Sequence, residues 1–249
     1  MLMRRLIPIA GAALLLLPAA ASPAASPRAS AQLNQCHPAL DAAQRWAVFG
    51  GTMRSLRGGQ DRMDMRFDLY RRARGSLVFK RVAAPGLGVW NRANPGVGRF
   101  KFRQKVENLS APAAYRAVVS FRWIGADGRV FARAQRVTAV CGQPLPDLRV
   151  VGITRPLGTG TYRVTVHNAG SLASRGFDVS LSVGGRPVAP NQTAGALQPH
   201  QSEVLTFARP GCADPVVATA DPGNGVPESN EANNTLTTSC LAIAASRSR

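Results

Sequence analysis

The sequence predicts an all-β protein built from two antiparallel β-sandwich domains in tandem behind an export signal. Short segments in which apolar and polar residues alternate recur at intervals of about ten residues along the chain. Turn-forming Gly, Asn and Asp residues separate these segments, and no long helical periodicity follows the N-terminal region. The 249 residues are 45% hydrophobic, which supplies packed cores and excludes a chain that is disordered throughout.

Residues 1–31 have the three-part pattern of a secretory signal peptide. A short positive segment with Arg4 and Arg5 precedes the apolar run Leu6–Leu17, and small residues follow. The small residues allow cleavage after Ala21 or after Ala31, and the sequence leaves both sites open. The apolar run has about a dozen residues, whereas a membrane span needs roughly 20. We therefore expect the leader to be removed and the protein to be extracellular or in the cell envelope, without a membrane span.

The first predicted domain covers residues 32–143. Apolar side chains at alternate positions of residues 63–69 are typical of a half-buried strand. Phe100, Phe102 and Val106 mark a second strand, and residues 115–123 form the longest one. A turn at residues 125–128 predicts a hairpin into a strand over residues 130–140. A short helical turn is expected near residues 38–45.

The second predicted domain covers residues 147–241 and is followed by a short tail, residues 242–249. Alternation over residues 162–166 and 177–183 predicts two strands, each followed by a Gly-containing turn. Further strands are expected at residues 187–189, 204–207, 216–220 and 235–240.

Four cysteines agree with an oxidising destination: Cys36, Cys141, Cys212 and Cys240. They form no Cys-x-x-Cys pair, and no His lies at metal-site spacing from any of them. Four cysteines permit three pairings. Their positions favour Cys36 with Cys141, which brackets the first predicted domain, and Cys212 with Cys240, which lies within the second.

The net charge of +18 is unevenly distributed. Residues 32–146 hold 20 basic against 6 acidic residues, whereas residues 147–249 hold 8 against 7. This shift in composition indicates a domain boundary. The sequence Gly142-Gln143-Pro144-Leu145-Pro146-Asp147 predicts a short, stiff connector at that boundary.

A distinctive string of Asp, Asn and Glu residues lies in the second half. It runs Asp221-Pro222-Gly223-Asn224-Gly225-Val226-Pro227-Glu228-Ser229-Asn230-Glu231-Ala232-Asn233-Asn234-Thr235. Together with the opening residues 146–150 and the Val-x-Asn-x-Gly ending of residues 164–170, it resembles the signature of the CARDB family, a bacterial immunoglobulin-like module named for presumed cell-adhesion roles. The resemblance covers residues 147–241 and implies a seven-stranded sandwich that mediates binding or spacing on exported proteins, without enzymatic activity. At residues 197–200 the family more often has a glycine, so the type of this turn is left open.

The first half resembles an immunoglobulin-like sandwich at one point. Tyr115, preceded by Pro112-Ala113-Ala114, has the position of a tyrosine corner, in which the hydroxyl ties a loop to the start of a strand. Ala117 stands where antibody domains have their second core cysteine, so the domain is expected to lack that bridge. Trp90 lies in a Gly- and Pro-rich loop, and it either anchors a ligand or covers an edge of the core.

The string of acidic and amide residues has two interpretations. Its oxygen-bearing side chains are Asp221, Asn224, Glu228, Asn230, Glu231, Asn233 and Asn234. In the first interpretation these side chains bond nearby backbone N–H groups between two strands. In the second, Asp221, Asn224 and Glu228 form a weak Ca²⁺ site, although their spacing differs from that of an EF-hand. The turn interpretation is favoured, and we expect no bound metal.

The basic first half suggests an anionic ligand. Arg99, Lys101, Arg103 and Lys105 alternate with apolar residues, so they are expected on one face of a strand. Outside a cell, a positive sheet face attracts anionic polymers of the surface, and nucleic acid only as a non-specific polyanion. The alternative is a solvated face in an Arg-rich chain. The candidate polyanion-binding residues are Arg66, Arg99, Lys101, Arg103, Lys105, Arg116 and Arg122.

The sequence offers little support for catalysis. The three histidines are scattered, and there is no Gly-x-Ser-x-Gly elbow, phosphate loop or dinucleotide fingerprint. We therefore expect an exported, non-catalytic binding or adhesion module that uses no cofactor and contacts surface polymers or proteins. The first alternative is a structural spacer of the cell envelope that has no ligand. A less favoured alternative is an extracellular enzyme or a hydrolase accessory protein.

Overall fold

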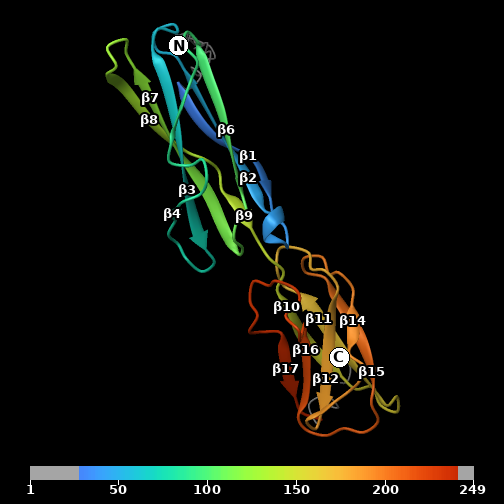
Figure 1. Cartoon of the computed structure of the whole chain (residues 1–249). Helices are drawn as coiled ribbons and strands as arrows, with labels where there is room; N and C mark the ends of the chain where they lie inside the picture. Colours follow the sequence, from blue (N-terminus) through green and yellow to red (C-terminus); the bar gives the residue numbers. More distant parts are fainter. Residues whose placement is uncertain (1–27, 241–249) are drawn as a thin grey trace, which may run out of the picture.

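The computed structural model describes residues 28–240, in which two β-sandwiches lie end to end (Figure 1). The predicted all-β class is confirmed, since antiparallel strands make up four sheets of the described chain. The expected helical turn near residues 38–45 is a short 3-10 turn, Ala42–Gln44.

The first sandwich, residues 28–143, packs a three-stranded sheet against a six-stranded one. The three-stranded sheet, called the β1 sheet below, has the order β1–β2–β6. Its strands are β1 (Ala29–His37), β2 (Trp46–Arg54) and β6 (Arg99–Glu107). The other, called the β3 sheet, has the order β4–β3–β7–β8, with β5 also on β3 and β9 also on β7. Its strands are β3 (Arg62–Ala73), β4 (Lys80–Val82), β5 (Trp90–Arg92), β7 (Ala113–Ile124), β8 (Val130–Val137) and β9 (Cys141–Gln143).

Alternate residues of these strands fill the first core, as the period of two requires. The buried side chains include Phe49 and Met53 of the β1 sheet and Phe67 and Phe121 of the β3 sheet. The Tyr115 hydroxyl donates a hydrogen bond to the Ser110 carbonyl at 3.0 Å, as expected for a tyrosine corner. The tied loop thus closes one end of the core, and the Cys36–Cys141 disulfide joins the two sheets.

The second sandwich, residues 148–238, packs a three-stranded sheet against a five-stranded one. The order of the first is β10–β11–β15, and the second has the order β13–β12–β16–β17, with β14 also on β12. The strands are β10 (Leu148–Thr154), β11 (Thr161–Asn168), β12 (Phe177–Val183), β13 (Arg186–Pro187), β14 (Gln192–Ala194), β15 (Ser202–Ala208), β16 (Val216–Ala220) and β17 (Thr235–Thr238). Their inward side chains, including Tyr162 and Phe207, form a second, separate core.

The turn over residues 197–200 departs from the CARDB pattern because His200 takes the place of a flexible residue. His200 has a φ of +64°, in the left-handed region that glycine enters most easily. Its N–H donates to the Asn168 carbonyl at 2.8 Å, and Gln201 N–H donates to the Gln198 carbonyl. The turn thus keeps a left-handed residue without a glycine.

Both disulfides have the pairing that the cysteine positions favour. Cys36 of β1 is bonded to Cys141 of β9, 105 residues apart in the sequence. Cys212 is bonded to Cys240, 28 residues apart. The first bond joins the beginning of the first sandwich to its last strand, next to the connector.

The junction between the sandwiches is tightly fitted around the connector. Leu145 is buried, and a side chain at Gly170 would collide with the backbone of residues 145–147. The Arg74 guanidinium donates to the Ser229 carbonyl, and Arg175 pairs with Asp41 at 3.0 Å. Beside these contacts lies an open cleft of about 660 Å³ lined by both sandwiches.

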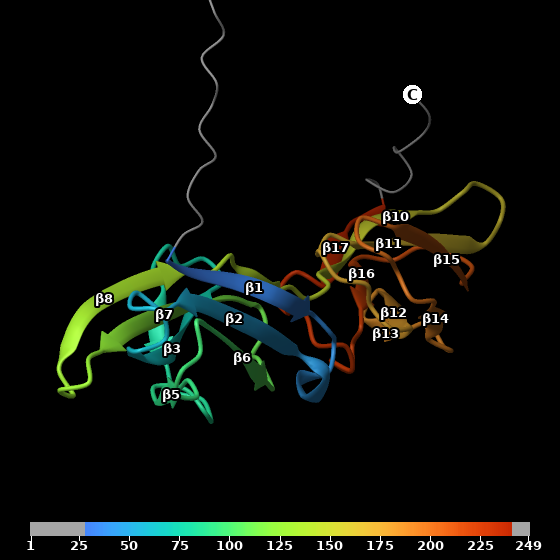
Figure 2. The ribbon, with the colours of Figure 1, turned by 90° about the horizontal axis from the view of Figure 1, so that it is seen from above.

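Several strands were missing from the sequence-based expectation, among them β1, β2, β4, β5 and β14. Strands β1 and β2 form most of the β1 sheet (Figure 2), and β1 begins at Ala29, within the segment expected to be a leader. Strand β17 ends at Thr238, earlier than expected, and residues 130–140 divide into β8 and the approach to β9. The proposed leader up to residue 27 and the tail from residue 241 lie outside the described residues.

Candidate polyanion-binding surface

Four of the predicted cations form one row on strand β6. Phe100, Phe102 and Val106 of this strand face the first core, so the odd-numbered positions of β6 face outward. The cations at these positions are all exposed, and alternate residues on a strand lie about 6.7 Å apart. The cationic row, as we call it, consists of Arg99, Lys101, Arg103 and Lys105.

Few carboxylates of the protein neutralise the positive charge of the cationic row. Lys105 forms an ion pair with Glu107 on the same strand, and its ammonium lies 5.2 Å from the centre of the Trp46 ring. Within residues 28–240, no carboxylate pairs with Arg99, Lys101 or Arg103. Arg99 also lies opposite Arg54 of β2, which adds another positive charge at that end. The row therefore keeps most of its charge available for an external anion.

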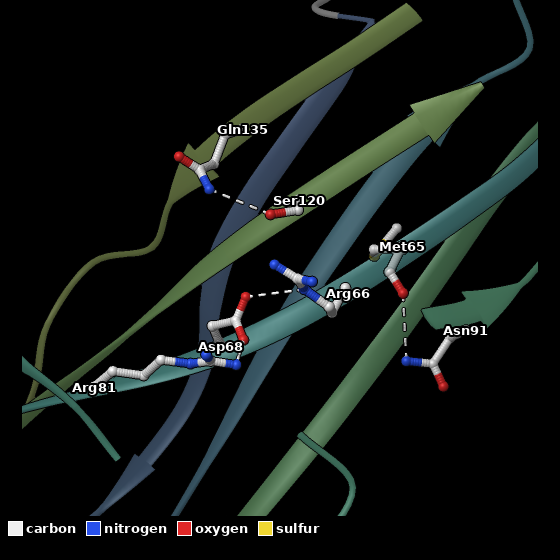
Figure 3. A network of polar contacts seen from close by, with 7 residues as sticks. All are labelled: Met65, Arg66, Asp68, Arg81, Asn91, Ser120 and Gln135. Carbon is white, nitrogen blue, oxygen red and sulfur yellow. Dashed lines mark hydrogen bonds and ion pairs between the residues drawn. The ribbon is translucent and has the colours of Figure 1, made fainter. Parts of the chain in front are cut away.

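The other three predicted cations lie on the β3 sheet and have partners. Arg66 donates to Asp68 at 3.1 Å, and Arg81 binds the same carboxylate (Figure 3). Arg122 donates to Asp64 at 2.8 Å across strands β3 and β7. Both carboxylates are almost fully buried, which makes these pairs part of the sheet.

Aromatic rings also pack against the predicted cations of the β3 sheet. The guanidiniums of Arg66 and Arg122 lie 5.1 and 4.1 Å from the centre of the Trp90 ring. Arg116 lies 4.1 Å from the centre of the Phe79 ring. Trp90 therefore packs on the charged outer face of the β3 sheet and neither covers the edge of the core nor stands free as a loop anchor. The seven predicted cations thus divide into an open row and a paired group on different sheets.

The acidic loop, residues 221–234, holds the connector. Asp221 accepts hydrogen bonds from the N–H groups of Gly225 and Val226, at 3.0 and 2.8 Å. Glu228 accepts from the Leu148 N–H and from the Asn234 amide. The Asp221 bonds are the turn chemistry expected from the sequence, whereas the bond from Leu148 to Glu228 ties the loop to the start of β10.

Further bonds extend this clamp to the connector. The Asn233 amide donates to Asp147, and the Ser229 N–H donates to the Pro146 carbonyl. Burial raises the pKa of Glu228 to about 7, although its hydrogen bonds from Leu148 and Asn234 act in the opposite direction. The signature residues therefore fasten the start of β10.

Two kinds of feature are absent from the described residues. No group of three or more His, Cys, Asp or Glu side chains in residues 28–240 is arranged to hold a metal ion. Within the same range, no helix is both long and apolar enough to cross a membrane.

Sequence reasoning missed the polar side chains of β1. Ser30, Gln32, Asn34 and Gln35 lie in the same sheet as the cationic row, on a strand that was partly assigned to the leader. The alternation of Ala29, Ala31 and Leu33 with polar residues was a usable signal, but a change of register after Leu33 interrupts it.

Comparisons with known proteins identify part of the chain. The family model described as CARDB matches residues 145–238. No curated protein sequence matches the chain.

The solved structures that match the chain share little sequence with it and superpose at low TM-scores. The class 5 fimbriae chaperone CfaA is 9% identical, with a TM-score of 0.27, and the match covers 84% of this chain and 97% of that one. Red sea bream transglutaminase is 14% identical, with a TM-score of 0.30 and coverages of 79% and 29%. The FN1-FN3 domains of chicken CNTN1 are 14% identical, with a TM-score of 0.25 and coverages of 84% and 68%. Matches at these scores carry no argument about function.

Proposed function

We propose that this protein, in which residues 145–238 form a CARDB domain, is an exported, non-catalytic binding module for anionic polymers of a cell surface. A CARDB domain and two disulfides are consistent with an extracellular or envelope location and with an adhesion-type role. We further propose that the two sandwiches are separate domains, with the first as the ligand-binding one and the second as its support.

The observation that carries this proposal is the cationic row. Three of its four cations lack a carboxylate partner in the described chain, whereas Arg66 and Arg122 of the β3 sheet are paired with buried carboxylates. Unpaired cations at regular spacing on an exposed strand attract a linear polyanion along the strand direction. Arginine adds bidentate contacts to carboxylate, sulfate or phosphate groups.

The structure also bears on the leader. Ala29 is buried and pairs with Met53, and Ala31 pairs with Gly51. Cleavage after Ala31 would therefore remove the first three residues of β1, whereas cleavage after Ala21 would leave the strand complete. We propose Ala21 as the last residue of the leader.

Retention on immobilised polyanions tests the binding function. The exported chain should bind polyuronate and polyphosphate at low salt, and the affinity should fall as salt rises. Replacing Arg99, Lys101, Arg103 and Lys105 by Ser should weaken binding and reduce the slope of log affinity against log salt by about 3. The matched control replaces four exposed arginines elsewhere by Ser, namely Arg129, Arg149, Arg163 and Arg186.

The two variants have the same net charge, so they separate a local surface from overall charge. Equal losses in both variants would show that only overall charge matters and would remove the cationic row from the proposal. No retention of any polyanion at low salt would favour the structural spacer instead.

A further inference from the structure

The outer face of the β1 sheet carries more than positive charge. The outward positions of the middle strand β2 are Trp46, Val48, Gly50 and Thr52, which are uncharged, and Arg54 at the end next to Arg99. The outward positions of β1 carry hydroxyl and amide groups. The face therefore has a cationic edge on β6, a centre on β2 that is uncharged up to Arg54, and an uncharged polar edge on β1.

A β-bulge brings two amides to the polar edge. Leu33 pairs with Phe49 and Gln35 pairs with Val48, so Asn34 is the extra residue between them. Phe49 is fully buried, and Gln35 therefore shares the outward orientation of Val48. We call the resulting set, Gln32, Asn34 and Gln35, the amide row.

Because Gly50 has no side chain, the Asn34 side chain can lie above it. The Asn34 amide lies directly over Gly50, in the space that a β-carbon at that position would occupy. Its oxygen is buried against Gly50 and has no hydrogen-bond partner within the described residues. A bulge and a glycine thus combine to lay an amide flat on the middle of the face.

A pair of stacked aromatic rings lies at one end of the outer face of the β1 sheet. His37 of β1 and Trp46 of β2 are parallel, with ring centres 5.2 Å apart, and His37 is exposed. The His37 ring is fixed by a 2.9 Å hydrogen bond between its Nδ1 and the Gln44 carbonyl. An exposed, fixed ring offers an apolar surface to the flat face of a sugar.

We infer that the ligand of this face is an acidic polysaccharide, an inference that rests on the proposed polyanion-binding function. The polymer lies along the strands with its acidic groups toward the cationic row and its hydroxyls toward the amide row. The two rows are separated by one strand, about 10 Å, so one sugar chain can contact both. Amides provide both donors and acceptors, which suits hydroxyl groups.

A phosphate polymer would use this face less completely. Polyphosphate has acidic oxygens along its whole length and lacks hydroxyls for the amide row. It would therefore bind through the four cations alone, and the amide row, Gly50 and the bulge would add nothing to its affinity. This difference separates the two ligand classes experimentally.

The test compares polyuronate with polyphosphate of equal charge, at a fixed salt concentration, on two variants. The amide variant, Gln32→Ala with Gln35→Ala, keeps every charge and changes only exposed side chains. Its control, Gln60→Ala with Gln135→Ala, removes two exposed amides elsewhere. We expect the amide variant to bind polyuronate about tenfold more weakly, equivalent to about 1.4 kcal/mol. Its affinity for polyphosphate should stay within about twofold of the parent.

Each result has a distinct meaning. Polyuronate binding that is unchanged in the amide variant would overturn the polysaccharide inference, while polyphosphate retention would keep the proposed function. Equal losses for both polymers would also overturn it, because the amides would then act without regard to hydroxyls. Failure of the unmodified protein to bind any polyanion would remove the inference and the proposed function together. Thermal unfolding of the amide variant, expected to match that of the control pair, excludes misfolding as a cause.

Discussion

Asp64 accepts two hydrogen bonds from the guanidinium of Arg122, at 2.8 and 3.0 Å, across strands β3 and β7. Arg92 contacts the same carboxylate at 3.4 Å, and Asp64 is fully buried. These arginines are part of the sheet's construction, whereas the cations of β6 are open to solvent. Pairing with a buried acid therefore distinguishes Arg66 and Arg122 from the open cations of β6.

Loss of the Asp64 charge should destabilise the first sandwich. We expect Asp64→Asn to lower the free energy of unfolding by about 2 kcal/mol, because charged hydrogen bonds in a buried position are lost. Glu107→Gln removes the exposed pair with Lys105 and should change the stability by less than about 0.5 kcal/mol. Urea unfolding of both variants gives the comparison. Equal effects would show that burial of Asp64 has no energetic role.

Glu228 makes the second sandwich sensitive to pH. Its pKa is raised from 4.5 to about 7 by burial. Between these values the unfolded chain has lost a proton that the folded chain retains. The stabilising contribution of Glu228 is therefore complete below pH 4.5 and is lost as the pH rises through about 7.

We expect this loss to be on the order of 2 kcal/mol, measured by urea unfolding across that pH range. In Glu228→Gln the corresponding part of the pH dependence should disappear, since the side chain no longer titrates. A variant with the same slope as the parent would show that another group causes it.

Two adjacent glycines should respond differently to the same substitution. In Gly50→Ala the new methyl group meets the flexible Asn34 amide, which can turn aside, so stability should change by less than about 1 kcal/mol. In Gly51→Ala it meets Met65 and Phe67 in the core, and overpacking should cost about 1–3 kcal/mol. Thermal and urea unfolding measure both. Similar losses at the two positions would mean that Asn34 is held rigidly.

The glycine variants also separate an effect on stability from an effect on ligand binding. Gly50→Ala should weaken polyuronate binding by displacing the Asn34 amide, although the protein remains folded. A folded Gly50→Ala variant with full polyuronate affinity would exclude Asn34 from the binding surface.

The exported protein should begin at Ser22. The N-terminal sequence or intact mass of the protein from its host decides between the two cleavage sites. A chain that begins at Gln32 lacks the Ala29–Met53 pairing and should be less stable by about 1–2 kcal/mol. Isolation of the shorter form as the sole mature protein would contradict the assignment of Ala21.

The sequence predicted the strands that have one buried face and one polar face. Residues 115–123 and 177–183 are such strands, and the structure places them in β7 and β12. Strand β1 was not predicted because its bulge interrupts the alternation of apolar and polar residues and because the small residues at its start resemble a leader. Register changes arise from pairing with β2, which a single strand's pattern does not contain.

The arrangement of the candidate cations could be predicted to a different degree on each sheet. Alternation placed the four cations of β6 together, since one strand is enough to define a row. The pairing of Arg66 and Arg122 depends on acids that are near them only after β3 and β7 pair. The binding role of the row stays a prediction until the polymer measurements are made.

The Cys36–Cys141 bond changes how the molecule carries a mechanical load. A pull transmitted from the second sandwich reaches Cys141 through the connector and passes directly to Cys36 in the first strand. The chain between the two cysteines, which contains β2 and β6, is therefore a covalently closed loop. If a polymer held by β6 is pulled away from whatever grips the CARDB domain, both arms of this loop share the force, and β6 cannot be drawn away from the connector further than the closed loop allows.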